Sequence, residues 1–308
     1  MENTRAKTTR NSLILLLTAT IWGMAFVSQS KGMDYMHPFT FNGVRSLIGA
    51  AGILVYILIS RKIAGDKAAK LDWKLNAKAG LLCGIFLTIA STLQQFGIKY
   101  TSVGKAGFIT TLYIIFVPMF GIFLKKKVAP VVWAAAGMAA VGMYLLCMTE
   151  SLRLGAGDIM VFLCAIAFAI QIMTVDHYAE RIDGAVVSCI QFTVCGVVCC
   201  IGALIWGQPT FGQLQDGLGA LLYAGVLSCG VGYTLQIVGQ KGLNPTVAAL
   251  IMSLESVIAT ISGWIAYKIG FLSTDQTLTP RQIAGCVIVF TAVILVQLPP
   301  EWFRFGKK

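Results

Sequence analysis

The stretch SLILLLTATIWGMAFVSQS, residues 12–30, contains no charged side chain. A helix that crosses a hydrocarbon core about 30 Å thick needs roughly 20 mainly apolar residues. Comparable stretches recur along the whole chain, and the last of them covers Arg281–Leu298. Across the 308 residues, 57% are apolar and only 12% are charged. These features predict a helical membrane protein that crosses the bilayer many times.

Ten apolar segments can be placed along the chain. They are Ser12–Ser30, Thr40–Ser60, Ala79–Gly97, Ser102–Leu124, Val128–Met148, Asp158–Val175, Ala185–Trp206, Gly217–Val238, Leu243–Tyr267 and Arg281–Leu298. The longest polar stretch between two segments, residues 61–78, is too short to bury a core of its own. We therefore expect an all-α integral membrane protein of ten transmembrane helices, without a soluble domain.

Lysine and arginine collect between alternate segments. With the N-terminus inside, 17 of the 24 basic residues lie on the cytoplasmic side and six lie outside, and Arg45 alone falls within the membrane. The cytoplasmic set includes the run Lys125–Lys127. Cytoplasmic loops are enriched in basic residues, so both termini are predicted to be cytoplasmic. The same distribution explains the net charge of +11 without nucleic-acid binding.

The two halves of the chain resemble each other weakly. An offset of 146 residues sets Trp22 on Phe168 and Arg45 on Gln191, and an offset of 142 sets residues 108–113 on 250–255. The halves 12–148 and 158–298 then hold five spans each, so the second half must enter the membrane with inverted topology. Inverted repeats place a binding site near the midplane between the halves.

Two ionisable residues lie deep inside predicted spans, where a charge normally faces the bundle interior or a wet cavity. Arg45 could anchor a substrate carboxylate or phosphate by paired hydrogen bonds, or instead pair with a structural carboxylate or a helix end. Glu255 lies near the middle of the ninth span, where hydrocarbon disfavours its charged form. It is a candidate for proton coupling or for binding a substrate ammonium, and the alternative is a role in fixing helix packing.

Further polar side chains fall within the spans. They are Asn42, Gln94, Gln95, Gln171, Gln191, Gln236, Tyr113 and Tyr233. Each alone suits a hydrogen bond between helices, whereas together they predict a polar cavity for a small zwitterion or metabolite. Trp22 inside the first span fits a pocket wall and plain packing equally well. Asp158 is explained by the start of the sixth helix.

Several function classes find no support in the sequence. The nine cysteines lie within spans and suit small packing residues, and two histidines do not suggest a metal site. No phosphate-binding loop, zinc-protease motif or nucleophile constellation is present, so we expect no catalytic residue, no metal and no cofactor. An integral-membrane enzyme is therefore disfavoured.

On longer motifs the chain resembles the EamA family of the drug/metabolite transporter superfamily. The matching stretches are Ala19–Gly23, Arg45 following Pro38, Thr101–Thr110, Gly155–Asp158, Tyr233–Gln236 and Ser253–Ser256. The resemblance implies a ten-helix carrier of the bacterial inner membrane, built from two five-helix repeats, whose relatives export amino acids and other small metabolites. Ser256 stands where the family often has proline, which predicts a less kinked ninth helix, and Lys268 stands where an acidic residue often closes it.

Together these features predict a secondary transporter, an exporter of small organic metabolites such as amino acids that works by alternating access. The expected substrate path comprises Trp22, Asn42, Arg45, Gln94, Gln95, Tyr113, Gln171, Gln191, Tyr233, Gln236 and Glu255, with Glu255 as the proton-coupling candidate. The expected partners are a small-molecule substrate and the lipid bilayer, and homo-oligomerisation stays open. The alternative is a channel-like or multidrug/quaternary-ammonium efflux protein.

Overall fold

The computed structural model describes residues 2–65, 71–101, 103–124, 130–147, 155–272 and 276–297. Within these ranges the chain is helical nearly throughout, and they contain no strand. Eight of the described helical segments are long and apolar enough to cross a membrane. The basic run Lys125–Lys127 lies outside the described residues. The protein is therefore a multi-pass helical membrane protein.

The described residues of the first half form six helices. They are α1 (Glu2–Gly32), α2 (Pro38–Ala64), α3 (Trp73–Tyr100), α4 (Val103–Thr111), α5 (Tyr113–Phe123) and α6 (Pro130–Cys147). Proline suits the first turn of α2, because backbone N–H groups in the first turn have no acceptor within the helix and the missing N–H of proline breaks no helical hydrogen bond. The Asp72 carboxylate caps α3 by accepting a hydrogen bond from the Leu75 amide at 2.9 Å. The helices α4 and α5 form one candidate span, residues 103–123.

The second half is more finely divided. It contains α7 (Ala156–Tyr178), the 3₁₀ turn η2 (Ala179–Arg181), α8 (Gly184–Gly202), the π-helices η3 (Ala203–Gly207) and η4 (Tyr223–Gly232), α9 (Phe211–Asp216), α10 (Leu218–Leu222), α11 (Tyr233–Gln240), α12 (Pro245–Met252), α13 (Glu255–Lys268) and α14 (Pro280–Gln297). One candidate span runs from α10 through η4 to α11, and another joins α12 to α13.

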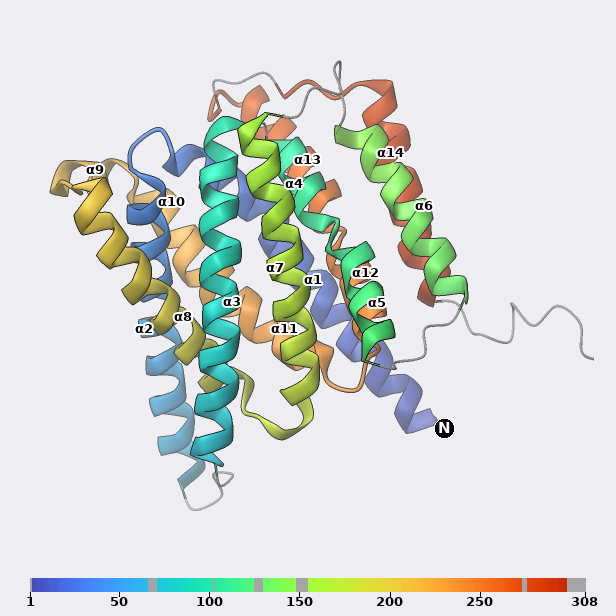
Figure 1. Cartoon of the computed structure of the whole chain (residues 1–308), viewed down its shortest axis with the longest axis horizontal. Helices are drawn as coiled ribbons and strands as arrows, with labels where there is room; N and C mark the ends of the chain where they lie inside the picture. The colour runs from blue at the N-terminus through green and yellow to red at the C-terminus, as the bar shows by residue number, and fades with distance from the viewer. Residues whose placement is uncertain are drawn as a thin grey trace, which may run out of the picture.

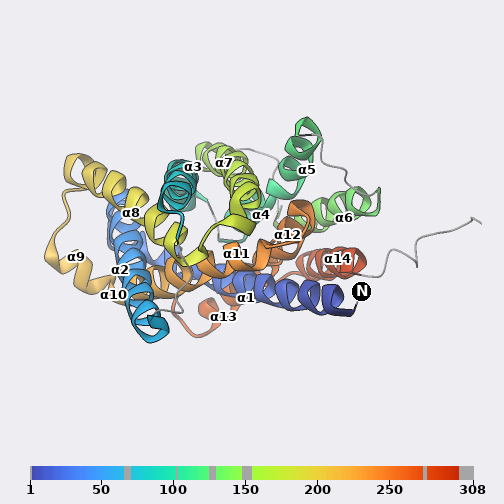
Figure 2. The ribbon, with the colours of Figure 1, turned by 90° about the horizontal axis from the view of Figure 1, so that it is seen from below.

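Most of these helices gather into one bundle (Figures 1 and 2). Its most extensive pairings are α3 with α7 and α2 with α8, so the two halves of the chain are interleaved. The helices α6 and α14 pack against each other at one edge of the bundle, as both views show. The body of the bundle is formed by α1–α5, α7, α8, α10, η4 and α11–α13.

A close crossing in this bundle depends on glycine. Gly97 on α3 faces Gly157 on α7, and a Cβ atom added to either would lie 2.8 or 2.9 Å from the carbonyl oxygen of the other. Such small residues let helix backbones approach closely in lipid, where no hydrophobic force drives helices together. The α3–α7 pairing thus fixes the first half against the second.

Two spans are interrupted near their middle. The helix α4 ends at Thr111 and α5 begins at Tyr113, while α12 ends at Met252 and α13 begins at Glu255. Before each break a hydroxyl donates to the carbonyl oxygen three residues back, Thr111 to Phe108 at 2.9 Å and Ser253 to Leu250 at 2.7 Å. Such bonds compete with the backbone ladder and bend helices.

The absence of proline at residue 256 predicts a less kinked ninth span, but the structure interrupts this span nonetheless. The reason is a tightened turn, in which the Leu254 amide donates to the Ile251 carbonyl and the Ser256 amide to the Ser253 carbonyl. Each of these bonds spans three residues rather than the four of an α-helix. The tightened turn at residues 251–256 therefore interrupts this span without a proline.

Candidate functional site

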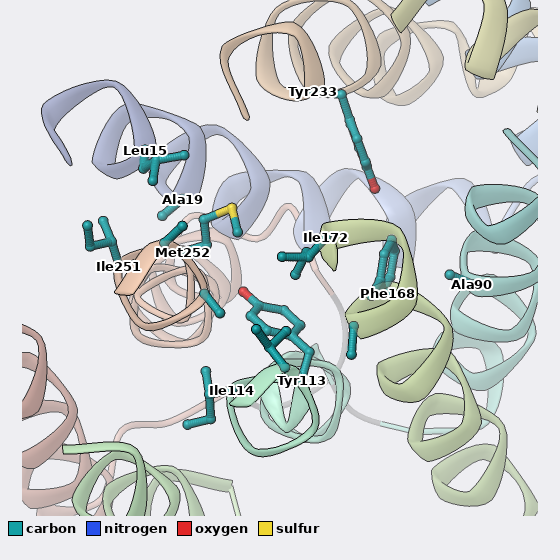
Figure 3. Packing of buried hydrophobic residues seen from close by; sticks show 14 of the residues in the cluster. Leu15, Ala19, Ala90, Tyr113, Ile114, Phe168, Ile172, Tyr233, Ile251 and Met252 are labelled. Carbon is teal, nitrogen blue, oxygen red and sulfur yellow. The ribbon is translucent and has the colours of Figure 1, made fainter. Parts of the chain in front are cut away.

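A cavity lies at the level of the two helix breaks and is lined by residues of both halves. Its polar lining comprises Trp22, Gln29, Arg45, Ser46, Ser91, Gln94, Thr110, Tyr113, Gln171, Ser228, Tyr233, Gln236 and Glu255. Figure 3 shows Tyr113 and Tyr233 reaching into this region from opposite sides, with Phe168 and Ile172 near them. A water-sized sphere can occupy about 30 Å³ of it. This is room for a water molecule or two, so the cavity is closed to an organic solute in this conformation.

Arg45 brings a positive charge to the cavity wall. It lies in the second turn of α2 and is only 5% exposed. Its Nε donates to the Asn42 side-chain oxygen at 2.9 Å, and its guanidinium carbon lies 5.3 Å from the centre of the Phe41 ring. Among the described residues no carboxylate lies within ion-pair distance of Arg45. The buried charge is thus held in place by neutral groups and remains available to an anionic group in the cavity.

Glu255 brings a carboxyl group to the same cavity. It is the first residue of α13 and is 4% exposed. The Tyr113 hydroxyl donates to its Oε1 at 3.0 Å, and no described lysine or arginine lies within ion-pair distance of it. A helix N-terminus carries a partial positive charge, which suits a carboxylate at this position. The break in the ninth span therefore presents an acid to the cavity.

Amide side chains also contribute to the polar walls of the cavity. Gln94 on α3 donates to the Thr110 hydroxyl of α4 at 3.2 Å. Gln171 on α7 and Gln236 on α11 exchange hydrogen bonds of 3.2 and 3.5 Å, and Gln171 also donates to Gln191 on α8 at 3.5 Å. These contacts bridge neighbouring helices, so the amides serve both as interhelical bonds and as cavity lining.

Two groups that line the cavity have unused hydrogen-bonding capacity. The Trp22 indole nitrogen and the Gln29 side-chain oxygen are buried, and neither has a partner among the described residues. The Trp22 ring packs against Tyr233 with 4.5 Å between ring centres. Leaving a buried donor or acceptor unpaired is unfavourable. A donor and an acceptor are therefore free to meet a bound solute or water.

Of the eleven residues expected along a substrate path, eight line this cavity. They are Trp22, Arg45, Gln94, Tyr113, Gln171, Tyr233, Gln236 and Glu255. The other three lie one layer behind it. Asn42 binds Arg45, Gln191 accepts from Gln171, and Gln95 donates to the Gln29 backbone carbonyl at 3.2 Å.

Sequence reasoning missed five polar residues of the cavity, namely Gln29, Ser46, Ser91, Thr110 and Ser228. The offset of 142 residues, which aligns residues 108–113 with 250–255, is supported by a further match that draws attention to one of the missed positions, Thr110. At an offset of 142, Thr92-Leu93-Gln94, Gly97 and Lys99 recur as Thr234-Leu235-Gln236, Gly239 and Lys241. Carried forward along α4, this register aligns Thr110 with Met252, next to the break before Glu255.

A second charged group joins the halves near the start of α7. Asp158 accepts from the Gly155 amide at 2.8 Å, as its predicted role at a helix start requires. It also pairs with Lys105 of α4, with 2.5 Å between Nζ and Oδ2, and accepts from the Thr101 hydroxyl at 2.9 Å. The side chains are 19% and 4% exposed for Lys105 and Asp158. The pair therefore ties the start of α4 to the start of α7.

A multi-pass helix bundle that encloses a polar cavity at two interrupted spans has the architecture of a membrane transporter. The EamA-like transporter family matches residues 10–148 and again residues 155–298. The chain therefore belongs to the EamA-like transporter family.

Related proteins carry the same general description. The chain is 28% identical over 290 residues to an uncharacterized transporter of Archaeoglobus fulgidus, covering 92% of this chain and 84% of that protein. It is 24% identical to the uncharacterized transporter YwfM of Bacillus subtilis, covering 94% of each chain. A solved crystal structure superposes with a TM-score of 0.74 at 16% identity, covering 96% of this chain and 99% of the other, which supports the fold alone.

Proposed function

We propose that this protein is a secondary transporter that exports small organic metabolites such as amino acids by alternating access. One observation carries the proposal, the presence of Arg45 and Glu255 on the wall of one closed cavity. A guanidinium suits the carboxylate of a solute and a carboxylate suits its ammonium group. A solute with both charges would satisfy both residues at once.

The neutral lining supports a solute of this kind. The unpartnered indole N–H of Trp22 adds a donor and the side-chain oxygen of Gln29 adds an acceptor. Phe26, Leu87 and Phe192 add apolar wall that suits an organic side chain. Pockets for small molecules combine mostly apolar walls with a few polar groups that fix orientation.

The proposed topology has ten transmembrane helices, with the N- and C-termini in the cytoplasm and the two halves inverted. Its support is the bias of lysine and arginine, the separate family match in each half, and the helix breaks at positions that differ by 142 residues. In this arrangement α6 and α14 are the fifth and tenth crossings. The membrane would be the bacterial inner, or plasma, membrane.

The closed cavity supports alternating access. A solute can enter only when one end of the bundle opens, because about 30 Å³ of free space does not accommodate it. The sequence holds no ATP-binding loop, so an ion or solute gradient would supply the energy. Glu255 is the candidate for proton coupling, since no other carboxyl group lies on the cavity wall among the residues that the structure describes.

A matched set of three ligands tests the site. L-Leucine carries both charges, 4-methylpentanoate only the carboxylate, and isoamylamine only the ammonium. A ligand that binds the folded state raises the apparent melting temperature by mass action. Of the three ligands, we expect L-leucine to give the largest rise in the melting temperature of the detergent-purified protein. Arg45→Ala and Glu255→Gln are each expected to abolish this rise. Shifts that survive both substitutions would exclude these residues from the site, and a larger shift with either single-charge analogue would contradict a zwitterionic solute.

Transport is tested in proteoliposomes. Saturable counterflow of labelled against unlabelled solute is expected of a carrier, whereas its absence alongside passive flux would favour the channel-like alternative. Glu255→Gln is expected to abolish the pH dependence of transport while the protein still inserts. Unchanged pH dependence would remove Glu255 from the coupling role.

A further inference from the structure

A second and larger cavity lies at the end of the bundle where α2 ends and α3 begins. Its volume is about 610 Å³, and we call it the inner vestibule. It is lined by Tyr56, Ile57, Ser60, Arg61, Ala64, Leu71, Asp72, Asn76, residues 180–185, Thr234, Val238 and Lys241. The lining carries charges of both signs. The proposed orientation puts this end in the cytoplasm.

One face of α8 reaches from the inner vestibule to the central cavity. Ala185 lines the vestibule and Phe192 lines the central cavity. With a rise of 1.5 Å per residue, the wall between the two positions is about 10 Å thick along the helix. Ser188 shares this face, because residues at i, i+3 and i+7 lie on one side of a helix. The two cavities are therefore separated by about two turns of α8.

The neighbouring helix α11 also borders both cavities. Thr234 and Val238 line the inner vestibule, whereas Tyr233 and Gln236 line the central cavity. Gln236 is hydrogen-bonded to Gln171, which in turn donates to Gln191 of α8. The wall between the two cavities therefore contains hydrogen-bonded polar side chains.

Within this wall, polar atoms on α8 lack partners. Ser188 and Gln191 are both fully buried. Neither the Ser188 hydroxyl nor the Gln191 side-chain nitrogen has a hydrogen-bond partner among the described residues. A buried polar group without a partner is unfavourable, so packing alone would be better served by apolar side chains here. These groups would be satisfied if solute or water passed them.

The duplication points to the same two positions. The offset of 146 residues that sets Arg45 on Gln191 also sets Asn42 on Ser188. Arg45 lines the central cavity, and the Asn42 side-chain nitrogen, like the Ser188 hydroxyl, is buried with no hydrogen-bond partner in the described part of the chain. In an inverted repeat the two pairs lie toward opposite ends of the bundle. Ser188 and Gln191 therefore hold, toward the cytoplasm, the positions that Asn42 and Arg45 hold toward the outside.

We infer that the inner leg of the transport path runs along α8, past Gln191 and Ser188, and joins the central cavity to the inner vestibule. In this conformation the leg is closed, and its polar lining meets solute and water when it opens. The inference rests on the proposed transport function for its direction. Whether the passage exists depends only on whether positions along α8 can be reached from the cytoplasmic side. This can be tested without knowing the solute.

Three single cysteines on α8 test the passage. Ser188→Cys reports on the proposed leg, Ala185→Cys on the vestibule as a positive control, and Val187→Cys on the adjacent fully buried position as a negative control. The probe is 2-(trimethylammonium)ethyl methanethiosulfonate, added to inside-out or right-side-out vesicles. Intact mass counts the labels beyond those of the unsubstituted chain, so the native cysteines set the baseline.

We expect Cys at 188 to gain one label from the cytoplasmic side, at a rate between those of the two controls and well above that of residue 187. Gln191→Cys is the second reporter and should behave alike. Labelling of residue 188 no faster than residue 187, while residue 185 reacts, would overturn the inference. Labelling of residue 188 in a protein that fails every transport assay would contradict the proposed function and leave the passage standing.

Discussion

The Tyr113 hydroxyl donates a hydrogen bond to the Glu255 carboxyl group, with 3.0 Å between Oη and Oε1. These are the first residues of α5 and α13, and they differ by 142 residues, the offset at which the two halves are proposed to match. Each follows a turn in which a hydroxyl bonds back to a carbonyl. The two helix breaks therefore bring these side chains into direct contact on the wall of the central cavity, and the contact joins the first half of the chain to the second.

Tyr113→Phe should weaken the protein measurably. The substitution keeps the ring but removes the donor to a buried carboxyl group, which costs about 1.5 kcal/mol in the free energy of unfolding. The measurement is unfolding of the purified protein in detergent, with Tyr56→Phe as control, because Tyr56 is 61% exposed. Equal unfolding free energies for the two variants would mean that the Tyr113–Glu255 bond contributes nothing to stability.

Breaking the ion pair between Lys105 and Asp158 should lower the unfolding free energy, although neither residue lines the central cavity. Asp158→Asn leaves the Lys105 ammonium beside a neutral amide, and the pair is intermediate between exposed and buried. We expect a loss of about 2 kcal/mol in unfolding free energy.

The matched control for this pair is the exposed one between Lys31 and Asp34, where the Asp34 side chain is 55% exposed. Asp34→Asn should change the unfolding free energy by less than about 0.5 kcal/mol. Denaturant titrations at low and high salt provide the comparison. Similar losses for Asp158→Asn and Asp34→Asn would show that burial adds nothing to the Lys105–Asp158 pair.

The membrane-protein fold could be predicted because long uncharged runs are the strongest signal that a sequence carries. Arg45, Glu255 and the glutamines could be singled out because a charge or an amide in hydrocarbon needs a partner or a cavity. Serine and threonine carry no such signal. Thr20 and Thr88, for example, donate to their own helix at the carbonyls of Leu16 and Gly84, so a hydroxyl in a span need not face another helix.

The helix breaks were beyond sequence reasoning for a related physical reason. Whether Thr111 and Ser253 bond three or four residues back decides between a bend and a continuous helix, and the residue type permits both. Likewise the pairing of Lys105 with Asp158 depends on how α4 meets α7. Such contacts are set by packing between distant segments rather than by local pattern.

The glycine crossing of α3 and α7 should tolerate no added carbon. Gly157→Ala would bring its Cβ to 2.9 Å from the Gly97 carbonyl oxygen, so the helices must separate. We expect a loss of about 2 kcal/mol in unfolding free energy, the usual range for overpacking. Gly52→Ala is the control, since no atom lies within 4 Å of its added Cβ. That variant should be neutral or slightly more stable. Equal behaviour of the two would contradict the close crossing.

The glutamines Gln29 and Gln95 should respond in opposite ways to the same substitution. Gln29 lines the cavity, and its side-chain oxygen has no hydrogen-bond partner among the described residues. Gln29→Met therefore breaks no hydrogen bond of this oxygen. Gln95→Met removes the hydrogen bond that the Gln95 side chain donates to the backbone carbonyl of Gln29, behind the cavity. We therefore expect Gln29→Met to keep the unfolding free energy but weaken solute binding about fivefold, as loss of one neutral hydrogen bond would. Gln95→Met should lower stability by about 1 kcal/mol and leave the dissociation constant unchanged. Unfolding in detergent and ligand titration of the same two samples give both quantities. A stability loss confined to Gln29→Met, or a binding loss confined to Gln95→Met, would reverse the roles assigned to these two side chains.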